Sequence, residues 1–220
     1  MTKTALYYDD IFLDHIVPNG HPENDNRIKY IINKIKESNF KNLKFMNAPI
    51  ASDDILKLGH SDDYLNWLNS ITPKNDIISI DQDTFMSPKT LQAAKKSVGC
   101  IVNAIDSVID KKFKNAFCLS RPPGHHAERE KAMGFCFLST VGIAAKYLNK
   151  IKKFNRIAIV DFDVHHGNGT QNLLWNHSNF LFISIHQDKI FPFTGNKNEK
   201  GIQNNILNIP VKANSSSHEF

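Results

Sequence analysis

Cysteine is scarce in this 220-residue sequence, and long hydrophobic runs are absent from it. The three cysteines, Cys100, Cys118 and Cys136, are odd in number and far apart, which argues against a disulfide framework and favours buried free thiols in a reducing compartment. No apolar run approaches the roughly 20 residues of a membrane span. Acidic residues at positions 9 and 10 come too early for a signal peptide. We therefore expect a cytoplasmic protein that does not bind membranes.

Clusters of basic residues are also lacking, although the 27 lysines and arginines exceed the 22 acidic residues and leave a net charge of +5. The lysines are scattered, and pairs such as Lys95-Lys96 and Lys152-Lys153 lie on the polar faces or at the ends of predicted helices. No zinc finger, basic helix with heptads or aromatic–basic ribonucleoprotein motif is present. The sequence therefore predicts no direct nucleic-acid binding, and it carries no signal for an oligomeric state.

Short apolar runs alternate with segments of helical periodicity, which predicts a single α/β domain over residues 1–220 with a mostly parallel sheet. Ser61 is expected to cap a short helix, and Ser87 with Pro88 to cap and begin the longest one. Strands are predicted at 4–8, 116–120, 156–161, 180–186 and 205–211, and helices at 27–38, from 61, at 89–110 and at 140–150. Ligands of such sheets bind where the strands end, so polar residues there are candidates for a site.

The most unusual polar cluster follows the predicted strand at 156–161. Asp161, Asp163 and His165 alternate along the chain and would project to the same side if the extended conformation continued. Burying two carboxylates and an imidazole without a counter-ion costs several kcal/mol, and this combination suits zinc or a similar divalent metal. Gly167 and Gly169 allow a sharp turn beyond them. A salt-bridged strand end that faces solvent is the alternative.

A second cluster is the histidine pair in segment 121–127. Two prolines stiffen this loop and a glycine permits its turn, so the imidazoles of His125 and His126 are held in place. A lone histidine would more often be structural, whereas a pair on a rigid loop predicts acid–base chemistry. Asp161 and Asn168 could each accept the far N–H of one imidazole. The histidine beside the aspartate should then hold its proton more tightly than the other.

Aromatic residues near the same edge of the predicted sheet are a weaker signal. Phe135, which follows Gly134, and Phe191 could wall a narrow slot for an alkyl chain, although aromatic residues are more often part of a core. The segments at 20–23 and 60–64, taken alone, are typical of turns and helix caps.

Together these segments resemble the histone deacetylase family, including its bacterial members that act on acetylated amines. The matching stretches are 21–23 with Arg27, 121–127, 134–137 and 161–171. Their order and spacing agree along nearly the whole chain, and the two histidine motifs are highly specific. The Gly-Asn-Gly-Thr-Gln end of the last stretch is similar to class II members rather than class I.

The resemblance implies a three-layer, arginase-like α/β fold and a zinc-dependent amide hydrolase that removes acetyl groups from acetyl-lysine or from acetylated small amines. It implies that Asp163 and His165 are two of the zinc ligands. It also implies that His125 and His126 form the catalytic pair, with His126 as the preferred general base.

Further residues correspond to the family's substrate tunnel and to a structural potassium site. The tunnel residues implied by the resemblance are Gly134, through its carbonyl group, Phe135 and Phe191. The potassium site would use the side chains of Asp161 and Ser184 and the carbonyl groups of Asp163, His165 and Ile185.

The family's third zinc ligand and its transition-state tyrosine have no counterpart here. No aspartate follows Asp188 and no tyrosine follows Tyr147. Ser216 and Glu219 have the spacing of a capping box, which normally opens a helix, although a frayed polar tail would also fit. We therefore expect the N-terminal two-thirds of a deacetylase domain, without its C-terminal strands.

Two alternative functions remain open. One is a non-catalytic remnant of such a deacetylase with an incomplete metal site. The other is a binuclear manganese hydrolase of the arginase type, which would require an aspartate where this chain has Gly167.

Overall fold

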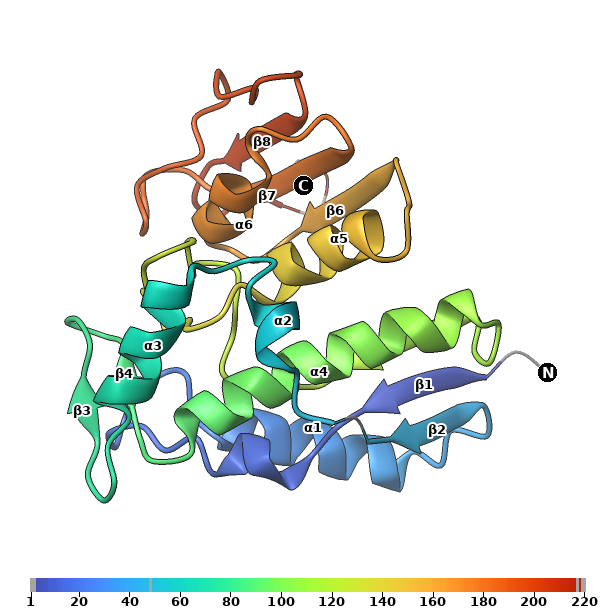
Figure 1. Ribbon diagram of the computed structural model, residues 1–220, viewed down its shortest axis with the longest axis vertical. Coiled ribbons are helices and arrows are strands. Elements are labelled where there is room, and N and C mark those ends of the chain that lie inside the picture. The colour runs from blue at the N-terminus through green and yellow to red at the C-terminus, as the bar shows by residue number, and fades with distance from the viewer. Residues whose placement is uncertain (1–2, 48, 217, 219–220) are drawn as a thin grey trace.

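The chain forms an α/β structure whose parallel strands fall into two separate sheets (Figure 1). The computed structural model describes residues 3–47, 49–216 and 218. In chain order the elements are β1 (Thr4–Tyr7), η1 (Asp10–Leu13), α1 (Asn26–Glu37), β2 (Leu43–Met46), α2 (Asp53–Leu56), α3 (Asp62–Ile71), β3 (Ile78–Ser79), β4 (Phe85–Met86), α4 (Thr90–Ile109), β5 (Asn115–Cys118), α5 (Thr140–Lys150), β6 (Ile157–Asp161), α6 (Asn168–Leu174), β7 (Phe180–Gln187) and β8 (Ile206–Val211).

The first sheet has the order β2–β1–β5, with all strands parallel. Strand β1 lies at its centre and buries three consecutive residues, Ala5, Leu6 and Tyr7. Such burial on both faces requires helices on both sides. Ile28 and Ile32 of α1 and Cys100 and Ala104 of α4 belong to the same buried cluster as these three residues. The first sheet is therefore the middle layer of three.

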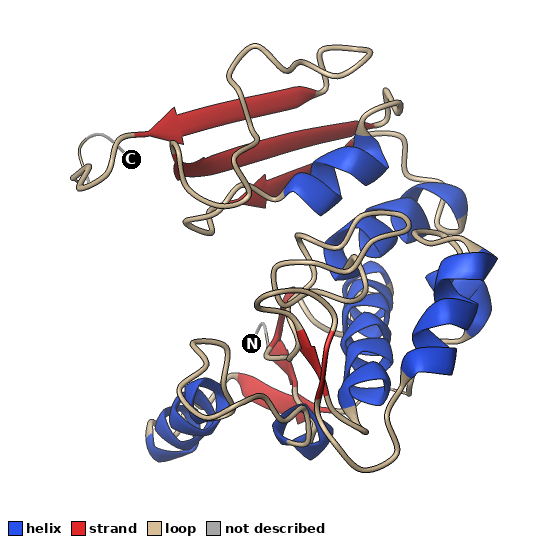
Figure 2. Cartoon of the chain, turned by 90° about the vertical axis from the view of Figure 1, so that its left-hand side faces the viewer, coloured by secondary structure: helices blue, strands red, loops and turns tan. Residues whose placement is uncertain are grey.

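The second sheet has the order β6–β7–β8, also parallel. Its helices α5 and α6 lie on one side (Figure 2). Leu173 and Leu174 of α6 pack there in one buried cluster with Phe180, Phe182 and Ile206. The opposite face carries exposed apolar side chains, and these are Val160, Leu181, Leu207 and Ile209.

A gap separates the two sheets, because β5 and β6 are each an edge strand within the described part of the chain. An apolar cleft of about 630 Å³ lies between them, lined by the α4 residues Ile101 and Ile105, by Ala116 and Cys118 of β5, and by Ile157 of β6. The predicted mostly parallel α/β architecture is confirmed, and within the described residues its parallel strands form two hydrogen-bonded groups.

The predicted elements are present, with ends that differ by at most two residues, and the helix Thr140–Lys150 has the predicted bounds. The prediction that Ser87 caps the longest helix and that Pro88 begins it is wrong. Helix α4 begins at Thr90, and Ser87 makes no cap because its buried hydroxyl accepts from the Ile16 N–H at 3.0 Å. Ser61 does cap α3, since its hydroxyl accepts from the Tyr64 N–H at 3.2 Å.

Several elements were not predicted from the sequence, namely η1, β2, α2, the β3–β4 hairpin and α6. The capping box at 216–219 lies outside the described residues. None of the helices in the described ranges combines the length and the apolar character that crossing a bilayer would require. All three cysteines are free, with Cys100 and Cys136 buried and Cys118 partly buried.

Candidate active site

The polar loops that follow β5, β6 and β7 meet at one edge of the structure. The paired histidines come from the loop after β5, Asp161 ends β6, and Phe191 lies in the loop after β7. The imidazole rings of His125 and His126 are 4.0 Å apart between centroids. The ring of His126 is 5.0 Å from that of Phe191. The loop after β5 of the first sheet and the loops after β6 and β7 of the second sheet thus bring together residues that are distant in sequence.

His125 is paired with the aspartate at the end of β6. Its Nδ1 lies 3.0 Å from Asp161 Oδ2, and its Nε2 lies 3.9 Å from Asp163 Oδ1. Burial is the largest single influence on the pKa of His125, and it disfavours the charged imidazole. The hydrogen bond and the negative charge of Asp161 outweigh burial, so the pKa of His125 is raised above its ordinary value. His125 therefore holds its proton tightly.

His126 is paired with an amide instead of a carboxylate. Its Nδ1 lies 2.7 Å from Asn168 Oδ1, and the side chain is buried. Burial, followed by repulsion from His125, lowers the pKa of His126 to about 3. His126 is therefore neutral at physiological pH. The two partners foreseen in the sequence are thus assigned, Asp161 to His125 and Asn168 to His126.

Asp163 and His165 lie next to each other in the loop after β6. Asp163 Oδ1 is 3.0 Å from His165 Nδ1 and accepts from the His165 N–H at 2.8 Å. Burial tends to raise the pKa of Asp163, but hydrogen bonds from His165 and the charge of His125 lower it overall. The carboxylate is therefore available to a cation.

The extended conformation does not continue through these residues, so the three side chains do not project to one side as they would in a longer strand. Strand β6 ends at Asp161, whose Oδ1 accepts from the Asp163 N–H at 3.1 Å and turns the chain. Gly167 helps to hold this turn, because a Cβ there would clash with Asp161 Oδ2. Asp161 therefore faces His125, while Asp163 and His165 form a separate pair.

Asp163 and His165 are chemically suited to share a zinc ion. Two ligands of a tetrahedral zinc, each about 2.0–2.2 Å from the metal, lie about 3.3 Å apart, close to the 3.0 Å found here. Structural and catalytic zinc sites have at least three protein ligands. Over the described ranges, no three His, Cys, Asp or Glu side chains come close enough together to hold a metal ion. The pair thus fits part of a zinc site.

The residues predicted to bind potassium are only partly gathered. Asp161 and Ser184 are neighbours across the β6–β7 pair. The Ser184 hydroxyl is fully buried and lies 3.0 Å from His186 Nδ1. Potassium binding by Asp161, Asp163, His165, Ser184 and Ile185 stays a prediction.

Two of the predicted tunnel residues, Gly134 and Phe191, lie against the histidine pair. The Phe191 ring lies 5.0 Å from His126 and 6.2 Å from His165. Gly134 has a φ of +55°, and a Cβ there would approach His126 Cδ2 to 2.5 Å, so no side chain fits. Phe135 packs instead against the ring of His21, at 4.7 Å. The segment at 20–23 thus packs against Phe135 through His21 and is more than a turn.

A buried ion pair behind the histidine loop was not foreseen. Arg121 donates to both carboxylate oxygens of Glu23, with one N···O distance of 2.7 Å, and to the Phe12 carbonyl oxygen at 2.9 Å. His15 Nε2 lies 3.2 Å from Glu23 Oε2. Burial opposes the ionised carboxylate, but hydrogen bonds from His15 and Arg121 and the charge of Arg121 lower the pKa of Glu23 to about 2.

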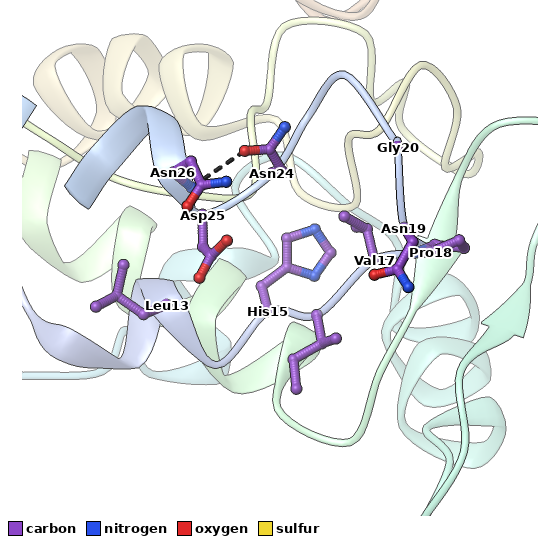
Figure 3. Close-up of a pocket in the computed structure, with 10 residues that line it drawn as sticks. Leu13, His15, Val17, Pro18, Asn19, Gly20, Asn24, Asp25 and Asn26 are labelled. Atoms are coloured by element: carbon purple, nitrogen blue, oxygen red, sulfur yellow. Dashed lines mark hydrogen bonds between the residues drawn. The ribbon is translucent and has the colours of Figure 1, made fainter. Parts of the chain in front are cut away.

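This ion pair ties the histidine loop to the N-terminal segment. The signal in the sequence was the charged Arg121 between an apolar strand and two prolines. His15 also lines a pocket of about 490 Å³ formed by segment 13–26 (Figure 3). The adjacent Arg27, which matched the family pattern, is exposed on α1.

His60 supports the same loop from the other side. Its Nε2 accepts from the Ser139 N–H at 2.9 Å, and its Nδ1 donates to the Arg129 carbonyl oxygen at 3.0 Å. The side chain is almost fully buried, and burial lowers its pKa to about 4. The sequence had suggested only a turn before a helix cap at this position.

Comparison with known families decides the relationship. The family described as "Histone deacetylase domain" matches residues 21–220. This chain belongs to the histone deacetylase family. The resemblance carried by the histidine and aspartate motifs is thereby confirmed.

Relatives of this deacetylase-family chain include two curated proteins. It is 35% identical to "Type-2 histone deacetylase 2" of Dictyostelium discoideum, over 99% of this chain and 15% of that protein. It is 34% identical to a "Probable deacetylase" of Archaeoglobus fulgidus, over 94% of this chain and 59% of that protein. The chain therefore spans less than two-thirds of the length of either relative.

A solved structure confirms the fold. The crystal structure of the HDA15 HD domain superimposes with a TM-score of 0.89 at 28% identity, covering 95% of this chain and 62% of that one. The deacetylase-like α/β fold predicted from the sequence is therefore correct.

Proposed function

We propose that this chain carries the acid–base histidines and two metal ligands of a zinc-dependent deacetylase that acts on acetyl-lysine or on acetylated small amines. Membership of the family supports hydrolysis of an acylated amine. One observation carries the proposal furthest. The rings of His125 and His126 are in contact, and the pKa of His125 is raised while that of His126 is lowered. The ring of His126 lies 5.8 Å from that of His165.

Asp163 and His165 would hold the zinc ion. A zinc ion bound there would polarise the acyl carbonyl group and make water acidic enough to lose a proton near neutral pH. A third ligand is required, and it is absent from the described residues. We propose that it belongs to a longer domain, since relatives exceed this chain in length.

His126 would act as the general base. It is neutral and buried, and its Nε2 is free to accept a proton if Nδ1 carries one. Because its proton affinity is low, His126 accepts a proton efficiently only from acidified water. His125, which holds its proton through Asp161, is suited to donate to the departing amine.

The substrate's alkyl chain would lie between Phe135 and Phe191, with the Gly134 carbonyl group as a hydrogen-bond acceptor. A structural potassium ion would stabilise the turn after β6 through Asp161 and its neighbours. The three free thiols support a reducing compartment such as the cytoplasm.

The first test measures zinc binding by calorimetry on the 220-residue chain. We expect weak binding that is abolished in Asp163→Ala and in His165→Ala, since each removes a ligand. His126→Ala is the matched control and should bind zinc as the wild type does. Unchanged affinity in both ligand variants would place the metal elsewhere.

The second test measures zinc-dependent, hydroxamate-sensitive release of acetate from acetyl-lysine peptides. We expect no release by the 220-residue chain alone, because two ligands hold zinc too weakly to resist ordinary chelators. A second candidate function, a non-catalytic remnant, predicts the same result. The absence of a third zinc ligand from the described residues favours this candidate. Robust turnover by the verified chain would show that a residue within it completes the site.

A further inference from the structure

The Asn168 amide lies between the proposed general base and a glutamate that the family motifs did not single out. Asn168 Oδ1 is 2.7 Å from His126 Nδ1, and Asn168 Nδ2 is 2.8 Å from Glu128 Oε1. The same Nδ2 is 3.5 Å from both the His126 carbonyl oxygen and Met133 Sδ. Asn168 is only 7% exposed, so water does not compete freely for these partners.

The chemistry of these neighbours fixes the direction of the amide. A carboxylate, a carbonyl oxygen and a thioether sulfur can only accept hydrogen bonds. The NH₂ end of Asn168 must therefore face them, which turns its Oδ1 toward the imidazole of His126. Because Oδ1 can only accept, the proton of neutral His126 must reside on Nδ1.

Among these acceptors, Glu128 has the dominant effect. Its oxygen is at an ordinary hydrogen-bond distance and carries charge, whereas the contact with the His126 carbonyl oxygen at 3.5 Å is at the outer limit for a hydrogen bond and the Met133 sulfur is a weak acceptor. A reversed amide would point Oδ1 at the carboxylate of Glu128, which is repulsive. It would also present NH₂ to His126 Nδ1 and drive the proton to Nε2.

We infer that Glu128 is a positioning residue that orients Asn168, keeps the proton of His126 on Nδ1 and leaves Nε2 free to accept a proton. This inference rests on the proposed function, in which His126 is the general base. His125 needs no such helper, because both oxygens of Asp161 can only accept. At His126, the Asn168 amide separates the negative charge of Glu128 from the imidazole. The imidazole therefore stays neutral while its tautomer is fixed.

The experiment measures the tautomer of His126 by NMR. The 220-residue chain is labelled with nitrogen-15 histidine, and long-range proton–nitrogen spectra distinguish Nδ1–H from Nε2–H imidazoles near neutral pH. The His126 signals are identified by their absence in His126→Ala. We expect Nδ1–H in the wild type. In Glu128→Gln the ratio of the two His126 tautomers should shift toward Nε2–H by about tenfold. The variant loses a charge-assisted hydrogen bond from Asn168, and the new amide can donate to a reversed Asn168 as well as accept from it.

Two further variants separate positioning from general structural support. Glu130→Gln makes the same change at an exposed glutamate and should leave the tautomer unchanged. In the double variant Glu128→Gln with Asn168→Asp, a carboxylate again faces His126, and the amide introduced at position 128 can donate to that carboxylate. The Nδ1–H tautomer should therefore return, which a merely structural role would not produce.

Three results would overturn the inference: an Nε2–H tautomer in the wild type, an unchanged ratio in Glu128→Gln, or no recovery in the double variant. The wild-type and double-variant measurements decide the matter even if Glu128→Gln alone folds poorly. The readout needs neither zinc nor substrate. Failure of the deacetylase proposal, seen as absent zinc binding, is therefore distinguishable from failure of this one.

Discussion

The two sheets differ in how they are covered. In β1, the centre of the first sheet, consecutive residues Ala5, Leu6 and Tyr7 are all buried, because α1 and α4 lie on opposite faces. In β7, the centre of the second sheet, Phe180 and Phe182 are buried but Leu181 between them is 40% exposed. Strands of parallel sheets are normally continuous apolar runs covered on both faces.

The first six residues of β7, Phe-Leu-Phe-Ile-Ser-Ile, are apolar except for one serine. This composition suits a covered sheet, while only one face is covered by the described residues. The first sheet is therefore stabilised by contacts within the described chain. We expect the second to gain stability from an additional layer.

The largest expected effect concerns the ion pair that ties the first sheet's N-terminal segment to the histidine loop. Glu23→Gln should lower the free energy of unfolding by about 3–5 kcal/mol, because Arg121 would remain buried without a counter-charge. Urea unfolding at neutral pH measures this. Asp25→Asn, which removes a partly exposed partner of Lys29, should cost less than about 1 kcal/mol. Equal losses in both variants would contradict the special role of the buried pair.

The same ion pair predicts acid sensitivity. Glu23 has a folded-state pKa of about 2, below the ordinary value of 4.5, so its contribution is complete above pH 4.5 and is lost as the pH falls toward 2. Glu23→Gln should flatten the stability profile in that window. A profile parallel to that of the wild type would show that Glu23 does not titrate as the structure indicates.

A somewhat smaller effect is expected from His60, which supports the loop at 129–139. Its folded-state pKa is about 4, against an ordinary value of 6.5, so below pH 6.5 the unfolded chain binds a proton that the folded chain refuses. The share of His60 in the loss of stability should be roughly 3 kcal/mol as the pH drops from 6.5 to 4. His60→Gln should reduce that slope when unfolding is measured at several pH values. An identical slope would assign it to other groups.

The smallest effect on stability is expected on the open face of the second sheet. Leu181→Lys with Leu207→Lys should change the free energy of unfolding by less than about 0.5 kcal/mol per site, since both side chains are already substantially exposed. The pair should nevertheless reduce self-association in sedimentation velocity, because it breaks an apolar surface. Phe182→Ala, on the covered face, should cost about 3–5 kcal/mol. A large loss from the lysine pair would mean that the open face is covered in solution.

Local patterns were sufficient for much of the fold. The isoleucines of α1, spaced three and four residues apart, and the β-branched run of β6 predicted a helix and a strand because amphipathic periodicity and burial are encoded over short distances. Local patterns gave wrong predictions where a residue distant in sequence determines the hydrogen bond that a side chain makes. Ser87 has the composition of a helix cap, but its hydroxyl is used by Ile16, which is 71 residues away.

In the candidate site, the sequence alone determined which residue types meet: a histidine pair, an aspartate and an asparagine to orient them, and an Asp163–His165 pair suited to a metal. Only the tertiary structure decided that Asp161 pairs with His125 and that Glu128 sets the direction of Asn168. It also decided that Glu23 and Arg121 neutralise each other behind the loop. The spacing of a motif concerns residues that are close together in sequence, whereas these pairs join residues that are 36 to 98 positions apart. Their strength depends on burial, which arises only when the loops after separate strands are brought together.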